Sequence, residues 1–128
     1  MNDLTGKTIL VAEDDPINMM VAVKILESKK ANIIKAVNGV EALAKLAGKI
    51  KIDLVLLDLE MPEMDGYNTL ARIRERYGSL PVLAFTAHPL DKQMENSLIE
   101  KGFTDSISKP FKPEPFYNKI FRIFREVH

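Results

Sequence analysis

Five residues of three chemical types stand at the ends of four segments that read as short strands. They are Glu13, Asp14, Asp58, Thr86 and Lys109. Brought together, they would place three carboxylates, a hydroxyl and an ammonium group in one site. Crowded carboxylates raise one another's pKa unless a cation compensates their charge, and Mg²⁺ prefers oxygen ligands. These residue types therefore predict a Mg²⁺ site in which water fills some of the coordination positions.

Each of these residues also has an ordinary structural explanation. Acids after a strand often cap the next helix, so Glu13, Asp14 or Asp15 could cap a helix that begins at Pro16. A threonine is β-branched and suits a strand, and a lysine before a proline is usually a solvated charge. These explanations need independent coincidences at four strand ends, so one shared site accounts for the pattern better.

The apolar pattern predicts five strands that alternate with five helices. Strands are expected at 8–12, 32–37, 53–58, 80–86 and 105–108, and helices at 16–30, 39–48, 68–77, 91–101 and 113–127. This alternation predicts an α/β domain of flavodoxin-like (βα)5 topology, with a five-stranded parallel sheet in the order 2-1-3-4-5 and helices on both faces. The carboxyl ends of such strands meet at one edge, which would bring the five residues together.

Composition limits the class of protein. The chain has 128 residues, of which 46% are hydrophobic, so a single domain spanning residues 1–128 is expected. Basic and acidic residues both number 18, so no net positive field favours nucleic acid or an anionic membrane. The chain has no cysteine, which excludes disulfides and thiolate chemistry. No apolar run reaches the roughly 20 residues that span a bilayer, so we expect a cytoplasmic domain without direct nucleic-acid or membrane contact.

Four motifs in register carry a family resemblance. They are Glu13-Asp14, the Asp58–Gly66 stretch DLEMPEMDG, Phe85-Thr86-Ala87 and Lys109-Pro110-Phe111. Together they resemble the receiver domain of response regulators in two-component signalling, over essentially the whole chain. The lead-in from Leu4 to Leu10 resembles that of receivers attached to hybrid histidine kinases, which favours a piece of a larger kinase over a stand-alone regulator.

The resemblance implies a role for the acidic residues. Asp58 would be the nucleophile that takes a phosphoryl group from a phosphohistidine on a histidine kinase or a histidine phosphotransfer protein. Glu13, Asp14, Asp58 and the backbone carbonyl of Glu60 would hold Mg²⁺. The metal and Lys109 would offset the repulsion between the attacking carboxylate and the phosphoryl oxygens.

The resemblance also implies roles for the other two strand ends. The Thr86 hydroxyl and the Ala87 N–H would bind phosphoryl oxygens after transfer. The peptide bond between Lys109 and Pro110 is a candidate cis bond, although trans is the commoner isomer.

Three features depart from the family pattern or modify it. Receivers usually carry an aromatic switch residue on the fifth strand, and the matching position here is Ser106. Either the output uses other residues and the domain mainly relays phosphate, or a small residue is simply tolerated on an edge strand. Glu60 and His88 stand two residues after Asp58 and Thr86, where the family tunes hydrolysis of the phosphoryl group, and His88 is otherwise a loop residue before a proline.

The first helix carries one apolar stripe and three residues beside it. The stripe expected to pack on the sheet consists of Val21, Ala22, Ile25 and Leu26. Met19, Met20 and Val23 are left over. They could form a docking patch for a helix bundle that bears the histidine, although methionines on a helix more often fill the core.

Two other functions are alternatives to a receiver domain. The first is a Mg²⁺-dependent phosphatase with an aspartyl-phosphate intermediate, but such enzymes carry the nucleophile on the first strand and need a cap over the substrate. The second is an interaction module that works without phosphorylation, which would be expected to have lost a key residue. The expected phosphoacceptor is not an enzyme in the usual sense, although it takes part in its own phosphorylation and dephosphorylation.

Overall fold

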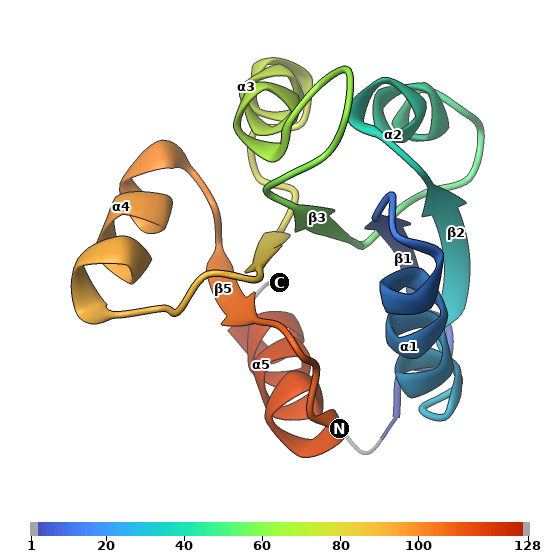
Figure 1. Cartoon of the computed structure of the whole chain (residues 1–128). Coiled ribbons are helices and arrows are strands. Elements are labelled where there is room, and N and C mark those ends of the chain that lie inside the picture. The colour runs from blue at the N-terminus through green and yellow to red at the C-terminus, as the bar shows by residue number, and fades with distance from the viewer. Residues whose placement is uncertain (1–2, 127–128) are drawn as a thin grey trace.

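The computed structural model describes residues 3–126 as five strands that alternate with five helices along the chain (Figure 1). The elements are β1 (Thr8–Ala12), α1 (Pro16–Glu27), β2 (Asn32–Ala36), α2 (Gly39–Leu46), β3 (Leu54–Asp58), α3 (Gly66–Arg76), β4 (Val82–Thr86), α4 (Lys92–Lys101), β5 (Asp105–Ser108) and α5 (Pro113–Glu126). Every expected element is present, with ends that differ by a few residues. The last helix was predicted to reach Val127, which lies outside the described residues.

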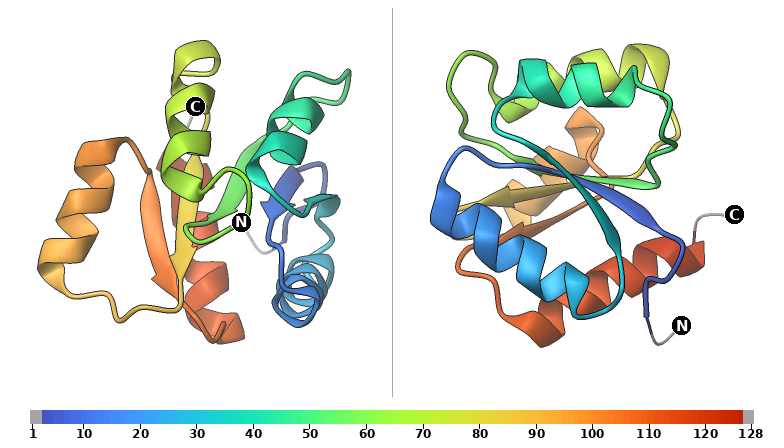
Figure 2. Two further views of the ribbon diagram at one scale, coloured as in Figure 1. Left: turned by 45° about the horizontal axis from the view of Figure 1, so that its top comes forward. Right: turned by 90° about the vertical axis from the view of Figure 1, so that its right-hand side faces the viewer.

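The strands form one parallel sheet in the order β2-β1-β3-β4-β5, which confirms the predicted topology. Helices α1 and α5 cover one face of the sheet, and α2 and α3 cover the other (Figures 1 and 2). Helix α4 packs at the β5 side through Leu98, which belongs to the same core as α2 and α3. No helix within residues 3–126 has both the length and the apolar character needed to cross a bilayer.

Strand β3 lies at the centre of the sheet and is buried along its whole length. Its side chains alternate between two cores, with Leu56 facing α1 and α5 and Leu57 facing α2 and α3. Its last residue, Asp58, is 3% exposed. The buried strand therefore fixes the backbone of Asp58 at the carboxyl end of the sheet.

The apolar side of α1 differs from the predicted stripe. Met19 and Val23 are buried in the core beside Ala22, Ile25 and Leu26, whereas Val21 is only partly buried. These residues share one core with residues of α5 and the sheet, so the buried side is wider than one stripe. The burial of Met19 and Val23 supports the core-filling alternative, and docking at this helix stays a prediction. Met20 is 50% exposed, and all three residues line a cavity of about 440 Å³.

Gly66 begins α3, and its backbone does not need the freedom of a glycine. The glycines with a positive φ in the described chain are Gly6 and Gly102. A Cβ on Gly66 would lie 2.5 Å from the backbone oxygen of Asp58 and 2.8 Å from the Cα of Leu59. The lack of a side chain therefore lets α3 start directly against the end of β3.

Candidate functional site

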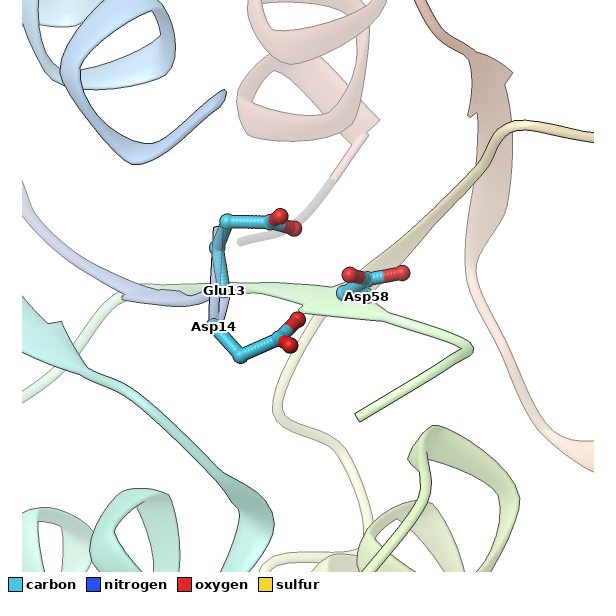
Figure 3. Close-up of side chains that lie close together, drawn as sticks. All are labelled: Glu13, Asp14 and Asp58. Carbon is cyan, nitrogen blue, oxygen red and sulfur yellow. The ribbon is translucent and has the colours of Figure 1, made fainter. Parts of the chain in front are cut away.

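Three carboxylates converge at the carboxyl ends of β1 and β3. Glu13 and Asp14 follow β1, Asp58 ends β3, and each offers one oxygen within 4.8 Å of the others. Figure 3 shows the side chains of Glu13 and Asp14 extending toward Asp58. Within residues 3–126 this is the one group of three or more acids or histidines close enough to share a metal ion.

The acid that caps α1 is Asp15, which leaves the other two acids after β1 free for the site. Its Oδ2 accepts a hydrogen bond from the Asn18 N–H at 3.1 Å, and Pro16 occupies the first turn. Glu13 Oε1 in turn accepts from the Asp15 N–H at 3.2 Å and from Asn18 Nδ2 at 3.4 Å. The start of the helix therefore holds the Glu13 carboxylate in place.

Lys109 joins the acids from the end of β5. Its Nζ lies 3.1 Å from Glu13 Oε2 and 3.1 Å from Asp58 Oδ2, and its side chain is 13% exposed. The ammonium also lies 5.2 Å from the centre of the Phe85 ring, a cation–π distance. The peptide bond between Lys109 and Pro110 is cis. Lys109 thus bridges two buried carboxylates with one positive charge.

One ammonium does not neutralise the acidic cluster. Burial, followed by the hydrogen bond and charge of Asp58, raises the pKa of Glu13 to about 7, although Lys109 acts to lower it. Burial lowers the pKa of Lys109, but Glu13 and Asp58 outweigh burial and raise it overall. The ammonium stays charged at neutral pH, while Glu13 holds its proton more tightly than an ordinary glutamate. The site therefore has a deficit of positive charge.

The cluster opens into a cavity of about 210 Å³. Six of the predicted site residues line this cavity, namely Glu13, Asp14, Asp58, Glu60, Ala87 and Lys109. Asp58 is thus reachable through the cavity although little of its surface is exposed. The volume is enough for a hydrated ion or a phosphoryl group, and it is too small for a large substrate.

Thr86 is the predicted site residue that does not line this cavity. It ends β4 and is fully buried, and its Oγ1 accepts a hydrogen bond from the His88 N–H at 3.1 Å. The strand register places Thr86 beside Ser108 and, through Phe85, next to Asp58. The hydroxyl is therefore close to the site in the sheet but covered in this conformation.

Glu60, which lines the cavity, contacts His88. The Glu60 N–H donates to Asp58 Oδ1 at 3.1 Å, and the Glu60 carboxylate lies 2.8 Å from His88 Nε2. Both side chains are more than half exposed, so this contact is a surface interaction. It links the loop after β3 to the loop after β4.

Ser106, at the position where the family resemblance led us to expect an aromatic residue, is 2% exposed and pairs with Ala84 of β4. Although β5 is an edge strand, this position is buried. A small side chain therefore occupies an enclosed position between β4, which ends at Thr86, and β5, which ends directly before Lys109.

Two contributors to the site were not identified from the sequence. Asn18 lines the cavity and donates to Glu13, and the Phe85 ring lies beneath Lys109. Asn18 follows Asp14 by about one helical turn, which is the signal that could have indicated it. No sequence signal indicated the ring, because its contact with Lys109 depends on how β4 and β5 pair.

A family model and the similar proteins of known name point to the same family. The family model described as "Response regulator receiver domain" matches residues 9–121. Sensor histidine kinase RcsC of Escherichia coli strain K12 is 39% identical over 110 residues, which cover 86% of this chain and 11% of RcsC. Histidine kinase 3 of Arabidopsis thaliana is 31% identical over 145 residues, which cover 96% of this chain and 14% of the kinase. The chain thus spans a small part of these relatives.

A solved structure of a receiver domain is also similar to this chain. The receiver domain of sensor histidine kinase PA1611 from Pseudomonas aeruginosa PAO1 is 29% identical, with a TM-score of 0.81. The match covers 92% of this chain and 97% of that domain, whose structure has a magnesium ion coordinated in the active site cleft.

Proposed function

Because the chain belongs to the response regulator receiver domain family, we propose that it accepts a phosphoryl group on Asp58 from a phosphohistidine, in a reaction that depends on Mg²⁺. Membership of this family places the chain in two-component signalling. The proposal adds the acceptor residue, the metal and the donor. It makes the domain a phosphoacceptor that takes part in its own phosphorylation, and the reaction would occur in the cytoplasm.

The observation that carries the proposal is the surroundings of Asp58. One of its oxygens faces Lys109 Nζ at 3.1 Å, and the other accepts the Glu60 N–H at 3.1 Å. A carboxylate held at both oxygens beside an open cavity is already oriented for attack on an incoming group. A purely structural ion pair would have no need of the additional acids at Glu13 and Asp14.

The donor set fits Mg²⁺. Three carboxylates and one ammonium leave a net negative charge in a partly buried place, and hard oxygen ligands are those that Mg²⁺ selects. Glu13, Asp14 and Asp58 would hold the ion, together with the backbone carbonyl of Glu60. When bound, Mg²⁺ supplies positive charge opposite the incoming phosphoryl oxygens.

The transfer itself exchanges one bond for another. A carboxylate oxygen of Asp58 attacks phosphorus, and the new P–O bond forms as the P–N bond to the donor histidine breaks. The imidazole nitrogen keeps the electron pair of the broken bond and takes a proton from solvent. Lys109 stays within reach of the Asp58 carboxylate and stabilises the charge that gathers around phosphorus.

Thr86 and Ala87 would hold the product. Ala87 already lines the cavity, so its N–H is near the place that the phosphoryl oxygens would occupy. The Thr86 hydroxyl accepts a hydrogen bond from His88 and keeps its own proton to donate. Because Thr86 is covered, the proposal requires the segment after β4 to shift when the phosphoryl group is present.

The donor would be a histidine kinase or a histidine phosphotransfer protein, in keeping with the histidine kinases among the relatives. With Ser106 buried at the switch position, we favour a domain that relays phosphate over one that drives a large rearrangement of β5.

Intact mass measurement after incubation with acetyl phosphate and Mg²⁺ tests the proposal. We expect the wild-type chain to gain the mass of one phosphoryl group and the Asp58→Asn variant to gain none. The matched control is Asp91→Asn, because Asp91 caps α4 through the Met94 N–H at 2.8 Å and asparagine caps equally well. Labelling of Asp58→Asn at the wild-type level would show that another residue is the acceptor.

A further inference from the structure

A second hollow, of about 530 Å³, lies away from the acidic cluster, along the edge of the sheet. One wall is β2, and the other is the end of α2 with the residues that follow it. The hollow is lined chiefly by Ile33, Ile34, Lys35, Lys45, Lys49 and Ile50. We call it the β2-edge hollow. It shares no residue with the cavity at Asp58.

The hollow follows the edge of β2 and not one face of the sheet. Ile33 packs against the core beneath α1 and α5, whereas Ile34 packs against the core beneath α2 and α3. Neighbouring residues of a strand point to opposite faces, so a hollow lined by both of them runs along the strand's edge. Strand β2 is the terminal strand of the sheet on this side.

The edge leaves backbone groups available. The Asn32 N–H donates to the Lys7 carbonyl at 2.9 Å, and the Ala36 carbonyl accepts from the Glu13 N–H at 3.0 Å. In a parallel pair every second residue bonds to a given neighbour, so Asn32, Ile34 and Ala36 direct their backbone groups to β1. The backbone groups of Ile33 and Lys35 then face the hollow, as expected for an edge strand.

The hollow is basic although the chain carries no net charge. Three of its lining residues are lysines, and none is an acid. Within the described residues, 3–126, the ion pairs of the chain do not include Lys35, Lys45 or Lys49. Lys45 lies in the last turn of α2, where it suits the helix dipole, but that role does not explain the other two.

We propose that the β2-edge hollow binds an extended, acidic segment of a partner protein, which adds to the sheet as a strand beside β2. The backbone groups of Ile33 and Lys35 would pair with the segment, and the lysines would contact its carboxylates. Apolar side chains of the segment would fill the space between Ile33 and Ile50. The side chain of Ile50 is 63% exposed. A second copy of the same edge is disfavoured, because its lysines would face these lysines.

The proposed binding does not involve phosphoryl transfer, although Lys35 also lines a separate cavity beside Glu13 and Asp14. The proposed ligand is recognised by backbone pairing and positive charge, and its binding requires neither Asp58 nor Mg²⁺. Failure of the proposed function would therefore leave this binding unaffected, and the Asp58→Asn variant is expected to bind the segment as the wild type does.

Amide shift mapping on the full ¹⁵N-labelled chain tests the inference. The probe is a short synthetic peptide in which pairs of glutamates alternate with pairs of valines, so that both faces of the added strand carry carboxylates and apolar side chains. The comparison peptide has lysine in place of glutamate. We expect the acidic peptide to shift the amides of β2 and of residues 45–50, and the basic peptide to shift neither. Reversing Lys35, Lys45 and Lys49 to glutamate should weaken binding at least about tenfold, from three exposed ion pairs.

Two controls separate strand addition from simple charge attraction. A variant with Lys92, Lys112 and Arg125 changed to glutamate carries the same net charge, and all three residues are exposed, so it should bind as the wild type does. Methylation of every second backbone nitrogen in the acidic peptide should abolish binding, because the donors needed for pairing are lost.

Three outcomes would overturn the inference. Equal binding of the methylated peptide would exclude strand addition, and unchanged binding after reversal of the three hollow lysines would exclude this surface. Phosphatidylserine vesicles that shift the same amides when the peptide does not would assign the hollow to a membrane surface.

Discussion

Replacing Glu13 with glutamine should make the metal-free domain more stable at neutral and alkaline pH. The folded chain raises the pKa of Glu13, first through burial and then through Asp58. The unfolded chain has no such effect, so folding favours the protonated form of this residue. Its contribution to stability is complete below about pH 4.5 and is lost as the pH rises through about 7.

The size of the effect follows from the two pKa values. The difference between an ordinary pKa of 4.5 and a pKa of about 7 corresponds to about 3 kcal/mol, at roughly 1.4 kcal/mol for each tenfold change in proton affinity. Since Glu13 is 1% exposed, solvent screens little of this. Glutamine keeps the shape and can accept the Asp15 N–H, but it carries no charge. The variant should therefore be about as stable as the wild type in acid and about 3 kcal/mol more stable near pH 8.

Urea unfolding followed by circular dichroism gives the free energy of unfolding at each pH. The measurement is made with EDTA and repeated with millimolar Mg²⁺. In EDTA the wild type should lose stability between about pH 4.5 and about pH 8 relative to the variant. In Mg²⁺ the gap should narrow, because the ion neutralises the carboxylate in the wild type and the variant has lost one ligand.

The control is Glu100→Gln, which removes a solvent-exposed carboxylate on α4. It should follow the wild-type pH profile. Parallel profiles for the wild type and Glu13→Gln in EDTA would refute the reasoning, since the acidic cluster would then carry no uncompensated charge. A gap that did not narrow in Mg²⁺ would count against a metal site at these acids.

Three further predictions concern other parts of the molecule. Gly66→Ala should cost about 1–3 kcal/mol and lower the melting temperature by several degrees, because the new Cβ would meet the backbone at Asp58. Gly78→Ala is the control, since its Cβ would lie 3.8 Å from its nearest neighbour. Equal melting temperatures for the two variants would contradict the packing argument. Burial raises the pKa of Asp105, but the Ser106 N–H, Arg122 and Lys119 outweigh burial and hold it below the ordinary 3.8. Asp105→Asn should therefore cost about 1 kcal/mol at neutral pH, and the cost should vanish as the pH falls through the folded-state pKa. A cost that persisted in strong acid would argue against this ionic contribution. The domain should not turn over p-nitrophenyl phosphate, and steady turnover with Mg²⁺ would favour the phosphatase alternative.

The elements and their order follow from local patterns. A strand buried on both faces needs a continuous apolar run, and residues 54–57 provide one directly before Asp58. A parallel sheet then brings its strand ends to one edge, so the grouping of Glu13, Asp14, Asp58 and Lys109 could be predicted without coordinates. The roles of these residues in phosphoryl transfer remain predictions.

Other features depended on packing between distant segments. The sequence left open which acid caps α1, and the structure assigns that role to Asp15. It also left open whether Met19 and Val23 fill the core or dock a partner, and the structure buries both in the core shared by α1, α5 and the sheet. Thr86 was expected at the cavity and is covered instead.

The sequence by itself therefore determined the fold class, the strand order and the set of residues at the sheet's carboxyl edge, because hydrophobic periodicity and topology rules act on short segments. Only the tertiary structure decided which of these residues touch. Lys109 meets Asp58 and Glu13 across 51 and 96 residues of sequence, and such contacts depend on strand register and helix packing, which no local pattern encodes.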